Sequence, residues 1–317
     1  MKIFAEEGGG DGGKQERKSG NITLGSSLVA SVNSPAWRSP SGDFAFGFHR
    51  IEGQKLYLLG IWFDKIRSKT LAWYANGDEL APEGSKLRAK NRWSAHSRDT
   101  EKSLSSRTAE NNFSRGHFGL RLIRDCNLVL NTIALPKGNA YEAYFWSNTI
   151  GTKSPNVTGN RLIFNKSARN YYYSAILEYD GVFTQYAHLK ASRNGKWEER
   201  WSRVWSKQDD ICSAIQGQFG LGTCGFNSYC MLVSNGRPNC KCLPGFNFSD
   251  PSNEFKGCEC DPIQRFNLDD TNLQDLYDMY TIDNIFWPNS SNYEELQFFN
   301  QDEFWNSCLF DSNCVVQ

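Results

Sequence analysis

Cysteine is the residue type whose spacing most clearly predicts chemistry in this sequence. Seven of the ten cysteines lie between Cys212 and Cys260, in the pattern C-x11-C-x5-C-x9-C-x-C-x15-C-x-C. The intervening residues are rich in turn formers and poor in apolar side chains. A short segment of that kind cannot bury enough apolar surface to offset its ordering entropy, so it needs crosslinks. Three disulfides among six cysteines allow 15 pairings, and the spacing alone leaves the connectivity open.

A zinc site is the competing interpretation of the same cysteines. Structural zinc sites usually space their first pair of ligands C-x(2–4)-C. The close pairs here, Cys240-Lys241-Cys242 and Cys258-Glu259-Cys260, have one intervening residue each, and no histidine lies in the cluster. The spacing therefore favours disulfides, and we expect neither a metal nor a cofactor. Disulfides in turn predict an oxidising, secretory compartment.

The rest of the sequence contains no catalytic constellation. The four histidines, His49, His96, His117 and His188, stand in unrelated contexts, and none lies beside a nucleophile signature. The motifs H-E-x-x-H and G-x-S-x-G are absent, and the glycines of residues 8–13 follow no predicted strand. The kinase signatures V-A-I-K, H-R-D and D-F-G are also missing. No carboxylate pair can be singled out for glycoside hydrolysis, so we predict that the chain is not an enzyme.

The composition is that of a β-rich chain without a charge bias. Thirty-five basic and 35 acidic residues give a net charge of zero, which argues against a nucleic-acid partner. Aromatic residues make up 14% of the 317 residues, and turn formers are plentiful, as in strands joined by turns. N-x-S/T sequons, which agree with a secretory origin, occur at Asn21, Asn112, Asn156, Asn165, Asn247 and Asn289.

No export signal or membrane anchor is visible in the sequence. Residues 1–20 are Gly-rich and charged and lack the apolar core of a signal peptide, so we interpret them as a disordered leader. The longest apolar run, Leu56 to Phe63, is too short to span a bilayer. We expect the secretory N-terminus to lie upstream of this sequence.

The apolar pattern predicts β-strands as the elements that position these residues. Phe44, Phe46 and Phe48 alternate on one face, residues 56–63 are continuously apolar, and residues 69–78 run into an Asn-Gly turn. Residues 118–130 predict a strand pair with a tight turn at 125–127, and residues 171–186 predict a hairpin that turns at Asp180-Gly181. Trp197, Trp201 and Trp205 could form one helical face or a packed loop. We expect a mainly β fold of the barrel or prism kind.

Two neighbouring stretches resemble a bulb-type lectin domain, in particular that of the plant G-type lectin S-receptor-like serine/threonine kinases. They are SPSGDFAFGF and, after it, LGIWFDKIRSKTLAWYANGDELAPEGSKL. The resemblance implies a three-fold β-prism, and we expect Trp62 and Trp73 to pack in its core rather than to contact sugar. The family pattern G-I-W-[YF]…T-[VL]-x-W-x-A-N-x-[DN] is met by Gly60, Ile61, Trp62, Thr70, Leu71, Trp73, Ala75, Asn76 and Asp78.

The family's mannose-binding motif, Q-x-D-x-N-x-V-x-Y, is matched in part. Asp125, Asn127 and Val129 are present, but Ile123 stands where Gln is expected and Asn131 where Tyr is expected. Polar side chains of this motif hydrogen-bond sugar hydroxyls, so the two replacements weaken the carbohydrate site that the resemblance implies. The alternative is that Asp125 and Asn127 only form the turn.

Residues 88–107 interrupt the resemblance. This basic run has almost no apolar periodicity, and it predicts a solvated loop rather than a surface for an acidic partner. A lectin of this type continues after residue 87 with further strands and two more sugar-site repeats. We therefore predict that parts of the domain are absent, after Leu87 and again after Asn165.

The later residues resemble successive parts of the same ectodomains. The cluster from Cys212, with its C-x-C-x-P-G-F turn, resembles an EGF module, and the usual pairing of that module implies the disulfides Cys212–Cys230, Cys224–Cys240 and Cys242–Cys258. Asp209 and Asp210 precede it as in calcium-binding modules, but Ile211 stands where those have Glu or Gln, which argues against calcium.

Five segments are therefore predicted. They are a disordered leader (1–20), an incomplete bulb-type lectin-like domain (21–130), an S-locus glycoprotein-like region (131–211), an EGF-like module (212–260), and an acidic, aromatic linker with a partial PAN/apple domain that begins with a short helix (261–317). Cys126 stands where the family has Gly and is expected to be a free thiol. The partners of Cys260, Cys308 and Cys314 are not predicted.

Two functional hypotheses of different class follow. The resemblance implies an extracellular recognition module of a plant receptor-like kinase, which binds a mannose-type glycan or a protein ligand for cell-surface signalling and can dimerise. The alternative is a truncated gene product, or a soluble S-locus-glycoprotein-like protein, with no sugar binding of its own. Both imply an extracellular or plasma-membrane ectodomain, attached to a membrane only through a segment that this sequence lacks.

Overall fold

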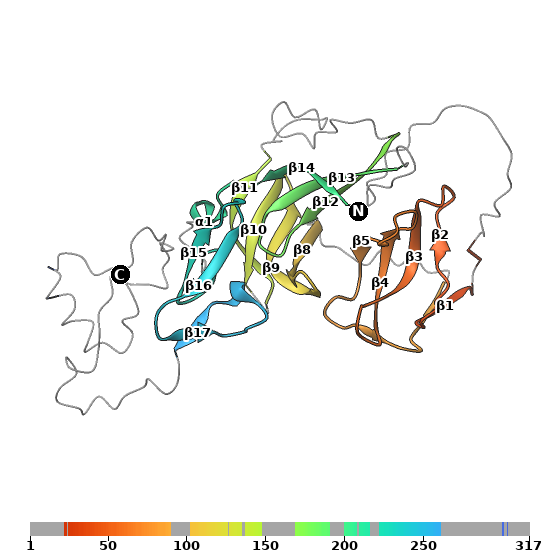
Figure 1. Cartoon of the computed structure of the whole chain (residues 1–317), viewed down its shortest axis with the longest axis horizontal. Helices are drawn as coiled ribbons and strands as arrows, with labels where there is room; N and C mark the ends of the chain where they lie inside the picture. Colours follow the sequence, from red (N-terminus) through yellow and green to blue (C-terminus); the bar gives the residue numbers. More distant parts are fainter. Residues whose placement is uncertain are drawn as a thin grey trace.

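The computed structural model describes residues 22–23, 25–89, 102–125, 127–134, 137–147, 169–190, 200–207, 209–215, 222–260, 300 and 303. Within these residues the chain is mainly β, as predicted, and its strands form several small antiparallel sheets (Figure 1). The predicted leader, Cys126, and the predicted PAN/apple region apart from Asn300 and Glu303 lie outside them, so those predictions stay predictions.

Residues 27–88 form the first part of the fold. One sheet has the order β2-β3-β4-β5, with β6 also paired to β4, and β1 pairs with β7 in a second sheet. Phe46 faces Ile61 and Phe48 faces Leu59 across β3 and β4, so two strands share the apolar face predicted from the alternation. The strands are β1 (Ser27–Val29), β2 (Trp37–Arg38), β3 (Phe44–Arg50), β4 (Leu56–Phe63), β5 (Leu71–Tyr74), β6 (Ala81–Pro82) and β7 (Lys86–Arg88).

Of the two tryptophans expected in the core, one lies there. Trp62 is buried in β4, and its Nε1 donates to Asp64 Oδ1 at 3.3 Å. Trp73 is 43% exposed, so the expectation for this residue is wrong. Trp73 faces Ile61 from β5, the outermost strand of its sheet, and no further described strand pairs with β5 to cover the side chain.

Residues 102–146 form a four-stranded sheet in the order β11-β10-β9-β8. Its strands are β8 (Lys102–Ala109), β9 (Asn112–Leu122), β10 (Leu128–Ala134) and β11 (Asn139–Trp146). The predicted strand pair at 118–130 is confirmed. The loop predicted over 88–107 is wrong from Lys102 onward, because Leu104 and Ser105 pair with Leu120 and Gly119 of β9. Strand β10 runs across the predicted domain boundary at residues 130 and 131.

A three-stranded sheet in the order β12-β13-β14 follows. Its strands are β12 (Tyr171–Leu177), β13 (Phe183–Leu189) and β14 (Ser202–Lys207). The predicted hairpin is confirmed, with Gly181 at φ +83° in its turn. Trp205 lies in β14 opposite Gln185, so the helical alternative for the tryptophan series is wrong at this position.

The cysteine-rich residues 211–260 contain short elements joined by three disulfides. The bonds are Cys212–Cys230, Cys224–Cys240 and Cys242–Cys258, the pairing that the EGF resemblance implies. The elements are α1 (Ile211–Ala214), β15 (Ser228–Leu232), β16 (Pro238–Cys242), β17 (Phe246–Phe248), the 3-10 turn η1 (Glu254–Lys256) and β18 (Cys258–Cys260), in which β15 pairs with β16 and β17 with β18.

One apolar core joins this module to the two preceding sheets. Phe118 of β9 is completely buried, and its ring lies 5.6 Å from that of Phe255 in η1, measured between centroids. The Tyr144 hydroxyl donates to the Gly181 carbonyl at 2.7 Å. The buried members of the core are Phe118, Leu130, Tyr144, Leu177, Phe183, Ile211, Cys212, Ile215, Cys224, Cys230, Cys240 and Phe255. The half-cystines thus supply apolar surface as well as crosslinks.

An aromatic cluster joins the first sheet to the sheet of β12–β14. The Phe63 ring lies 5.4 Å from that of Tyr172 and 5.0 Å from that of Trp201. The Tyr172 hydroxyl donates to Asp43 Oδ1 at 2.7 Å, and Trp201 Nε1 donates to Thr70 Oγ1 at 3.0 Å. Aromatic packing supplies the buried area here, and the two hydrogen bonds fix the direction of approach.

The substitution Gly181→Ala tests the tight junction at the β12–β13 turn. A Cβ there would lie 2.6 Å from atoms of both Ile211 and Phe118. The matched control is Gly53→Ala, because Gly53 has a similar φ of +75° with nothing within 4 Å of the added Cβ. Both variants should lose about 1–2 kcal/mol from left-handed backbone strain, and Gly181→Ala should lose about 1–3 kcal/mol more from overpacking. Urea unfolding measures both losses, and equal losses would contradict the shared core.

Candidate functional site

The residues that match the mannose motif form a turn and part of the core. Asp125 Oδ1 accepts from the backbone N of Asn127 and Asp125 Oδ2 accepts from its Nδ2, both at 2.9 Å. The Asn127 carbonyl accepts from the backbone N of Ile123 at 3.0 Å, which closes the loop between β9 and β10. Asn127 and Val129 are each 2% exposed, whereas Asp125 is exposed. The structure therefore leaves no open row of polar groups from these residues.

The last position of the motif also has a structural contact. Asn131, which replaces the expected Tyr, is 3% exposed, and its Nδ2 donates to the Tyr141 carbonyl at 2.7 Å. This bond joins β10 to β11 where the register between the two strands shifts on both sides of Asn131. An amide at this position thus satisfies a strand carbonyl beside an irregularity.

The lectin-like pattern around Asn76 has a structural explanation as well. Asn76 Oδ1 accepts from Leu59 N at 2.7 Å, and its Nδ2 donates to the carbonyls of Tyr57 and Glu79 at 3.2 and 3.0 Å. Asp78 Oδ1 accepts from Arg115 N at 2.7 Å and so connects the first sheet to β9. Both side chains therefore hold backbone groups of neighbouring strands.

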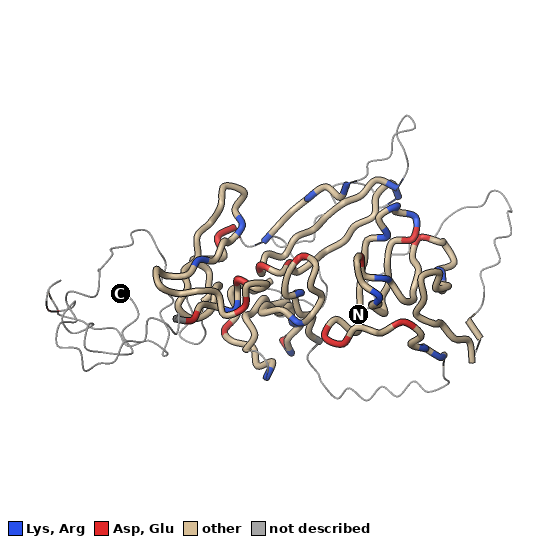
Figure 2. The backbone as a smooth tube through the Cα atoms, turned by 60° about the horizontal axis from the view of Figure 1, so that its bottom comes forward, with Lys and Arg blue, Asp and Glu red and all other residues tan. Residues whose placement is uncertain are grey.

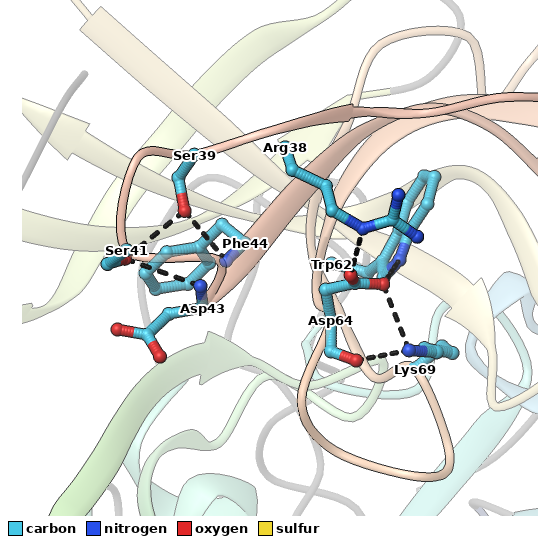
Figure 3. A network of polar contacts seen from close by, with 8 residues as sticks. All are labelled: Arg38, Ser39, Ser41, Asp43, Phe44, Trp62, Asp64 and Lys69. Carbon is cyan, nitrogen blue, oxygen red and sulfur yellow. Dashed lines mark hydrogen bonds and ion pairs between the residues drawn. The ribbon is translucent and has the colours of Figure 1, made fainter. Parts of the chain in front are cut away.

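A polar network surrounds Asp64 at the end of β4 (Figure 3). Its carboxylate accepts from Arg38 Nε at 2.7 Å and from Lys69 Nζ at 2.9 Å. Burial acts to raise the pKa of Asp64, but the hydrogen bonds from Lys69, Arg38 and Trp62 lower it overall. Lys69 has a φ of +48°, and its Nζ also donates to the Asp64 carbonyl. The network fixes the connection between β4 and β5.

The histidines do not form a catalytic group in the described part of the chain. Burial lowers the pKa of His117 to about 4, so this imidazole is neutral at physiological pH. His188 Nδ1 lies 2.9 Å from the Leu189 carbonyl, and its ring packs edge-on against Trp201. His96 is not among the described residues. The described residues contain no group of three or more His, Cys, Asp or Glu side chains able to hold a metal ion.

Asp210, considered above for calcium, caps α1 instead. Its Oδ1 accepts from Ser213 N at 3.0 Å, and its Oδ2 accepts from the Ser213 hydroxyl. An Asp at this position satisfies a backbone N–H that the helix leaves unpaired. Its carboxylate is therefore engaged in local structure.

An ionic junction at the β12–β13 turn was not anticipated from the sequence. Asp180 Oδ2 forms an ion pair with Arg237 Nε of the cysteine-rich module. Glu178 Oε2 lies 3.5 Å from an Arg107 guanidinium nitrogen of β8, and Glu178 Oε1 accepts from the Tyr186 hydroxyl at 2.8 Å. Burial raises the pKa of Asp180, with Arg237 acting in the opposite direction. The Asp-Gly pair predicted the turn, but no local pattern could identify partners so distant in sequence.

Exposed sequons and exposed apolar side chains lie on the surface of the described part of the chain. Of the six sequons, Asn112 and Asn247 are described, and both asparagines are exposed. Asn21, Asn156, Asn165 and Asn289 lie outside the described residues. Three consecutive apolar side chains, Met231, Leu232 and Val233, are 44%, 39% and 41% exposed at the end of β15. Figure 2 shows that acidic and basic residues are interspersed over the described chain.

The fold and these contacts define a β-rich chain, crosslinked by disulfides, in which lectin-like motifs serve structure. The comparison with known proteins agrees with this class. The chain is 30% identical to the G-type lectin S-receptor-like serine/threonine-protein kinase LECRK3 of Oryza sativa subsp. indica and 31% identical to LECRK4 of the same plant. It is 29% identical to the kinase RLK1 of Arabidopsis thaliana. The predicted resemblance is thereby confirmed. No protein-family model matches the chain.

The matches cover most of this chain but less than half of each relative. The LECRK3 match includes 93% of this chain but 46% of the relative, so the chain spans less than half the length of the relatives it matches. The alignment has 383 positions, and 93% of 317 residues is about 295. About 88 aligned positions, the difference between 383 and 295, therefore have no counterpart in this chain. A chain that lacks internal segments gives a difference of this kind, and the predicted places of these segments, after Leu87 and after Asn165, stay predictions.

The substitution Asn127→Ala tests the structural role of the residues that match the mannose motif. Removing a buried amide that pairs with Asp125 should lower the free energy of unfolding by about 1–3 kcal/mol. The control is Asn139→Ala in β11 of the same sheet, where the asparagine is exposed and the loss should be within about 0.5 kcal/mol. Chemical denaturation of the two variants measures the difference. Equal stability of Asn127→Ala and the parent chain would show that the turn does not depend on this side chain.

The ionic junction predicts a pH-dependent effect of Arg237→Met. The variant leaves the buried Asp180 carboxylate without its counter-ion and should lose about 3–5 kcal/mol at pH 7. Loss of Arg237 raises the pKa of Asp180 in the folded state further above the unfolded value of about 3.9. A carboxyl with a raised folded pKa favours the folded state when protonated, so the loss should shrink as the pH falls from 7 toward about 4.5.

A matched control for this variant is Lys256→Met, which removes an ion pair with Asp250 whose lysine side chain is 59% exposed. It should change stability by less than about 1 kcal/mol at either pH. Unfolding curves at the two pH values compare the variants. A loss from Arg237→Met that is constant or grows on acidification contradicts the assignment of the buried charge to Asp180.

Proposed function

We propose that the chain is an extracellular recognition module of the receptor-like-kinase type that binds a protein ligand. Similarity to named receptor-like kinases over 93% of the chain supports the receptor class. Three disulfides support an oxidising compartment. The proposed role is non-catalytic, because a recognition module acts by binding and the sequence contains none of the kinase signatures.

The preference for a protein ligand over a mannose-type glycan rests on the burial of two residues of the mannose motif, Asn127 and Val129. A sugar site needs polar groups that converge on hydroxyls in an accessible depression. Asn127 and Val129 are each 2% exposed, and the Asn127 amide pairs with Asp125. Polar groups already satisfied within the protein offer little to a hydroxyl-rich ligand, because binding would have to break those bonds first.

An extracellular location forms part of the same proposal. The exposed sequons at Asn112 and Asn247 would carry N-glycans in the secretory pathway, and the four sequons outside the described residues are proposed to do the same. No described helix has the length and apolar character that a membrane crossing requires.

The proposal is tested by expressing the whole chain behind a secretion signal and immobilising it. One probe is a high-mannose glycoprotein, and the other is an extracellular protein fraction from plant tissue. We expect no retention of the high-mannose glycoprotein. We expect retention from the extracellular fraction that is lost after protease digestion of that fraction and survives periodate oxidation of its glycans.

Two results contradict the proposal. Retention that periodate abolishes and protease spares would identify a glycan ligand instead. No retention from either probe, by a chain with its three disulfides intact, would support the alternative of a product without binding activity of its own.

A further inference from the structure

We propose that Asn235 is a site of spontaneous deamidation, which adds one negative charge to the tip of the β15–β16 hairpin (Figure 1). The reaction needs no enzyme, because the attacking group is the backbone nitrogen of Gly236. This inference goes beyond the proposed function, since it concerns a covalent change of the chain itself and holds whichever ligand the module binds.

The sequence offers this reaction at three places. Asn-Gly pairs occur at residues 76–77, 194–195 and 235–236. Deamidation requires the peptide nitrogen that follows the asparagine to approach the side-chain carbonyl carbon, and glycine permits this approach because it has no Cβ to obstruct it. Residues 194–195 lie outside the described part of the chain, so the structure distinguishes between the other two pairs.

The side-chain amide of Asn235 is held beside the attacking nitrogen. Arg237 N donates to Asn235 Oδ1 at 3.0 Å. A side-chain carbonyl bonded to the backbone N–H two residues on encloses the intervening peptide group, which here is that of Gly236. The bond thereby keeps Asn235 Cγ close to Gly236 N, as a reaction between these two atoms requires. It also places a donor on the oxygen that becomes negative when the nitrogen attacks.

The turn is open to solvent and has room for a cyclic intermediate. Asn235 is exposed. A Cβ built at Gly236, whose φ is +75°, would have one neighbour within 4 Å in the described part of the chain, the Asp209 carbonyl at 3.9 Å, apart from the adjoining residues. Gly236 N donates to the Val233 carbonyl at 2.8 Å. This bond must break before the attack, and an exposed turn opens at little cost in free energy.

The reaction is a cyclisation followed by hydrolysis. Gly236 N loses its proton to solvent and forms a bond to Asn235 Cγ, while the bond from Cγ to the side-chain nitrogen breaks and that nitrogen leaves as ammonia. Water then opens the succinimide ring at one of its two carbonyl carbons. Opening at Cγ gives Asp, and opening at the backbone carbonyl carbon gives isoaspartate, in which the chain continues through Cγ. One water is consumed and one ammonia is released.

Asn76 has the same following residue but a different environment. Its amide makes the three hydrogen bonds to backbone groups described above. A Cβ at Gly77 would clash with the Phe113 carbonyl oxygen, so this turn is crowded. Turning the Asn76 amide toward Gly77 N would break its hydrogen bonds and leave backbone groups unpaired. We therefore expect the fold to protect Asn76 and to leave Asn235 reactive.

The product changes the charge balance at the ionic junction. Arg237, two residues from Asn235, pairs with the buried Asp180 of the β12–β13 turn. A carboxylate at residue 235 places a second anion within two residues of this arginine, so one cation then serves two anions. Isoaspartate also lengthens the backbone of the hairpin. An aged chain therefore differs from a new one in both the charge and the geometry of this turn.

The experiment follows both asparagines in the secreted full-length chain, incubated at neutral pH with its three disulfides intact. Samples taken over time are digested at acidic pH, and peptide mapping by mass spectrometry resolves Asn, Asp and isoaspartate at residues 76 and 235. The same chain, reduced and denatured, shows how fast each pair reacts without the fold. The test variant is Gly236→Ala, whose methyl group hinders the attacking nitrogen. The matched control is Gly53→Ala, because Gly53 has the same φ of +75°.

In the folded parent chain we expect Asn235 to convert at least about tenfold faster than Asn76, to a mixture of Asp and isoaspartate. The denatured chain should convert the two at similar rates. Gly236→Ala should slow conversion of Asn235 at least about tenfold, and Gly53→Ala should leave it unchanged. Both variants are checked for the three disulfides, and the comparison of Asn235 with Asn76 in the parent chain needs no variant.

Any of four results overturns the proposal. They are an Asn235 that stays intact in the folded chain and converts in the denatured one, an Asn76 that converts as fast as Asn235 in the folded chain, formation of Asp without isoaspartate, and an undiminished rate in a correctly crosslinked Gly236→Ala. None of these results involves ligand binding, so failure of this inference leaves the proposed function standing, and failure of the proposed function leaves this inference standing.

Discussion

The packing of Phe118 against the cysteine-rich module is the interaction on which most of this structure depends. Its ring is completely buried between β9, the β12–β13 turn at Gly181 and Phe255 of η1. Half-cystines of the module belong to the same core as the aromatic residues of two sheets. A segment of about fifty residues holds few apolar side chains, and disulfides alone fix its shape without fixing its position. The shared core fixes the position.

This arrangement changes how the lectin-like motifs are understood. Asn76 and Asp78 hold backbone in the first sheet and connect it to β9, while Asp125 and Asn127 close a turn. Motifs that resemble a sugar-binding domain can thus be retained for folding, because the same polar side chains satisfy buried backbone groups. Trp73 illustrates the complementary case. This residue was expected in the core, and it is 43% exposed on the outermost strand of its sheet.

Short-range patterns predicted the parts of this structure that short-range physics determines. Alternation located β3, an apolar run located β4, and the Asp180-Gly181 pair located the hairpin turn. The disulfide pairing came from the EGF resemblance and not from the spacing, which left 15 possibilities. The ion pair between Asp180 and Arg237 could not be predicted from the sequence, because it depends on where the cysteine-rich module packs. The exposure of Met231–Val233 could not be predicted either, since an apolar run in a sequence indicates burial by default.

The central claim is that the cysteine-rich module and the sheets of β8–β14 form one cooperative unit. Native-state hydrogen exchange at increasing denaturant tests this most directly, because it reports the opening free energy of each amide separately. The account predicts that the amides of β9–β10 and those of β15–β16 open with the same free energy and the same dependence on denaturant. Amides of β15–β16 that stay protected after those of β9–β10 have exchanged would contradict it, since the module would then be stable without the shared core.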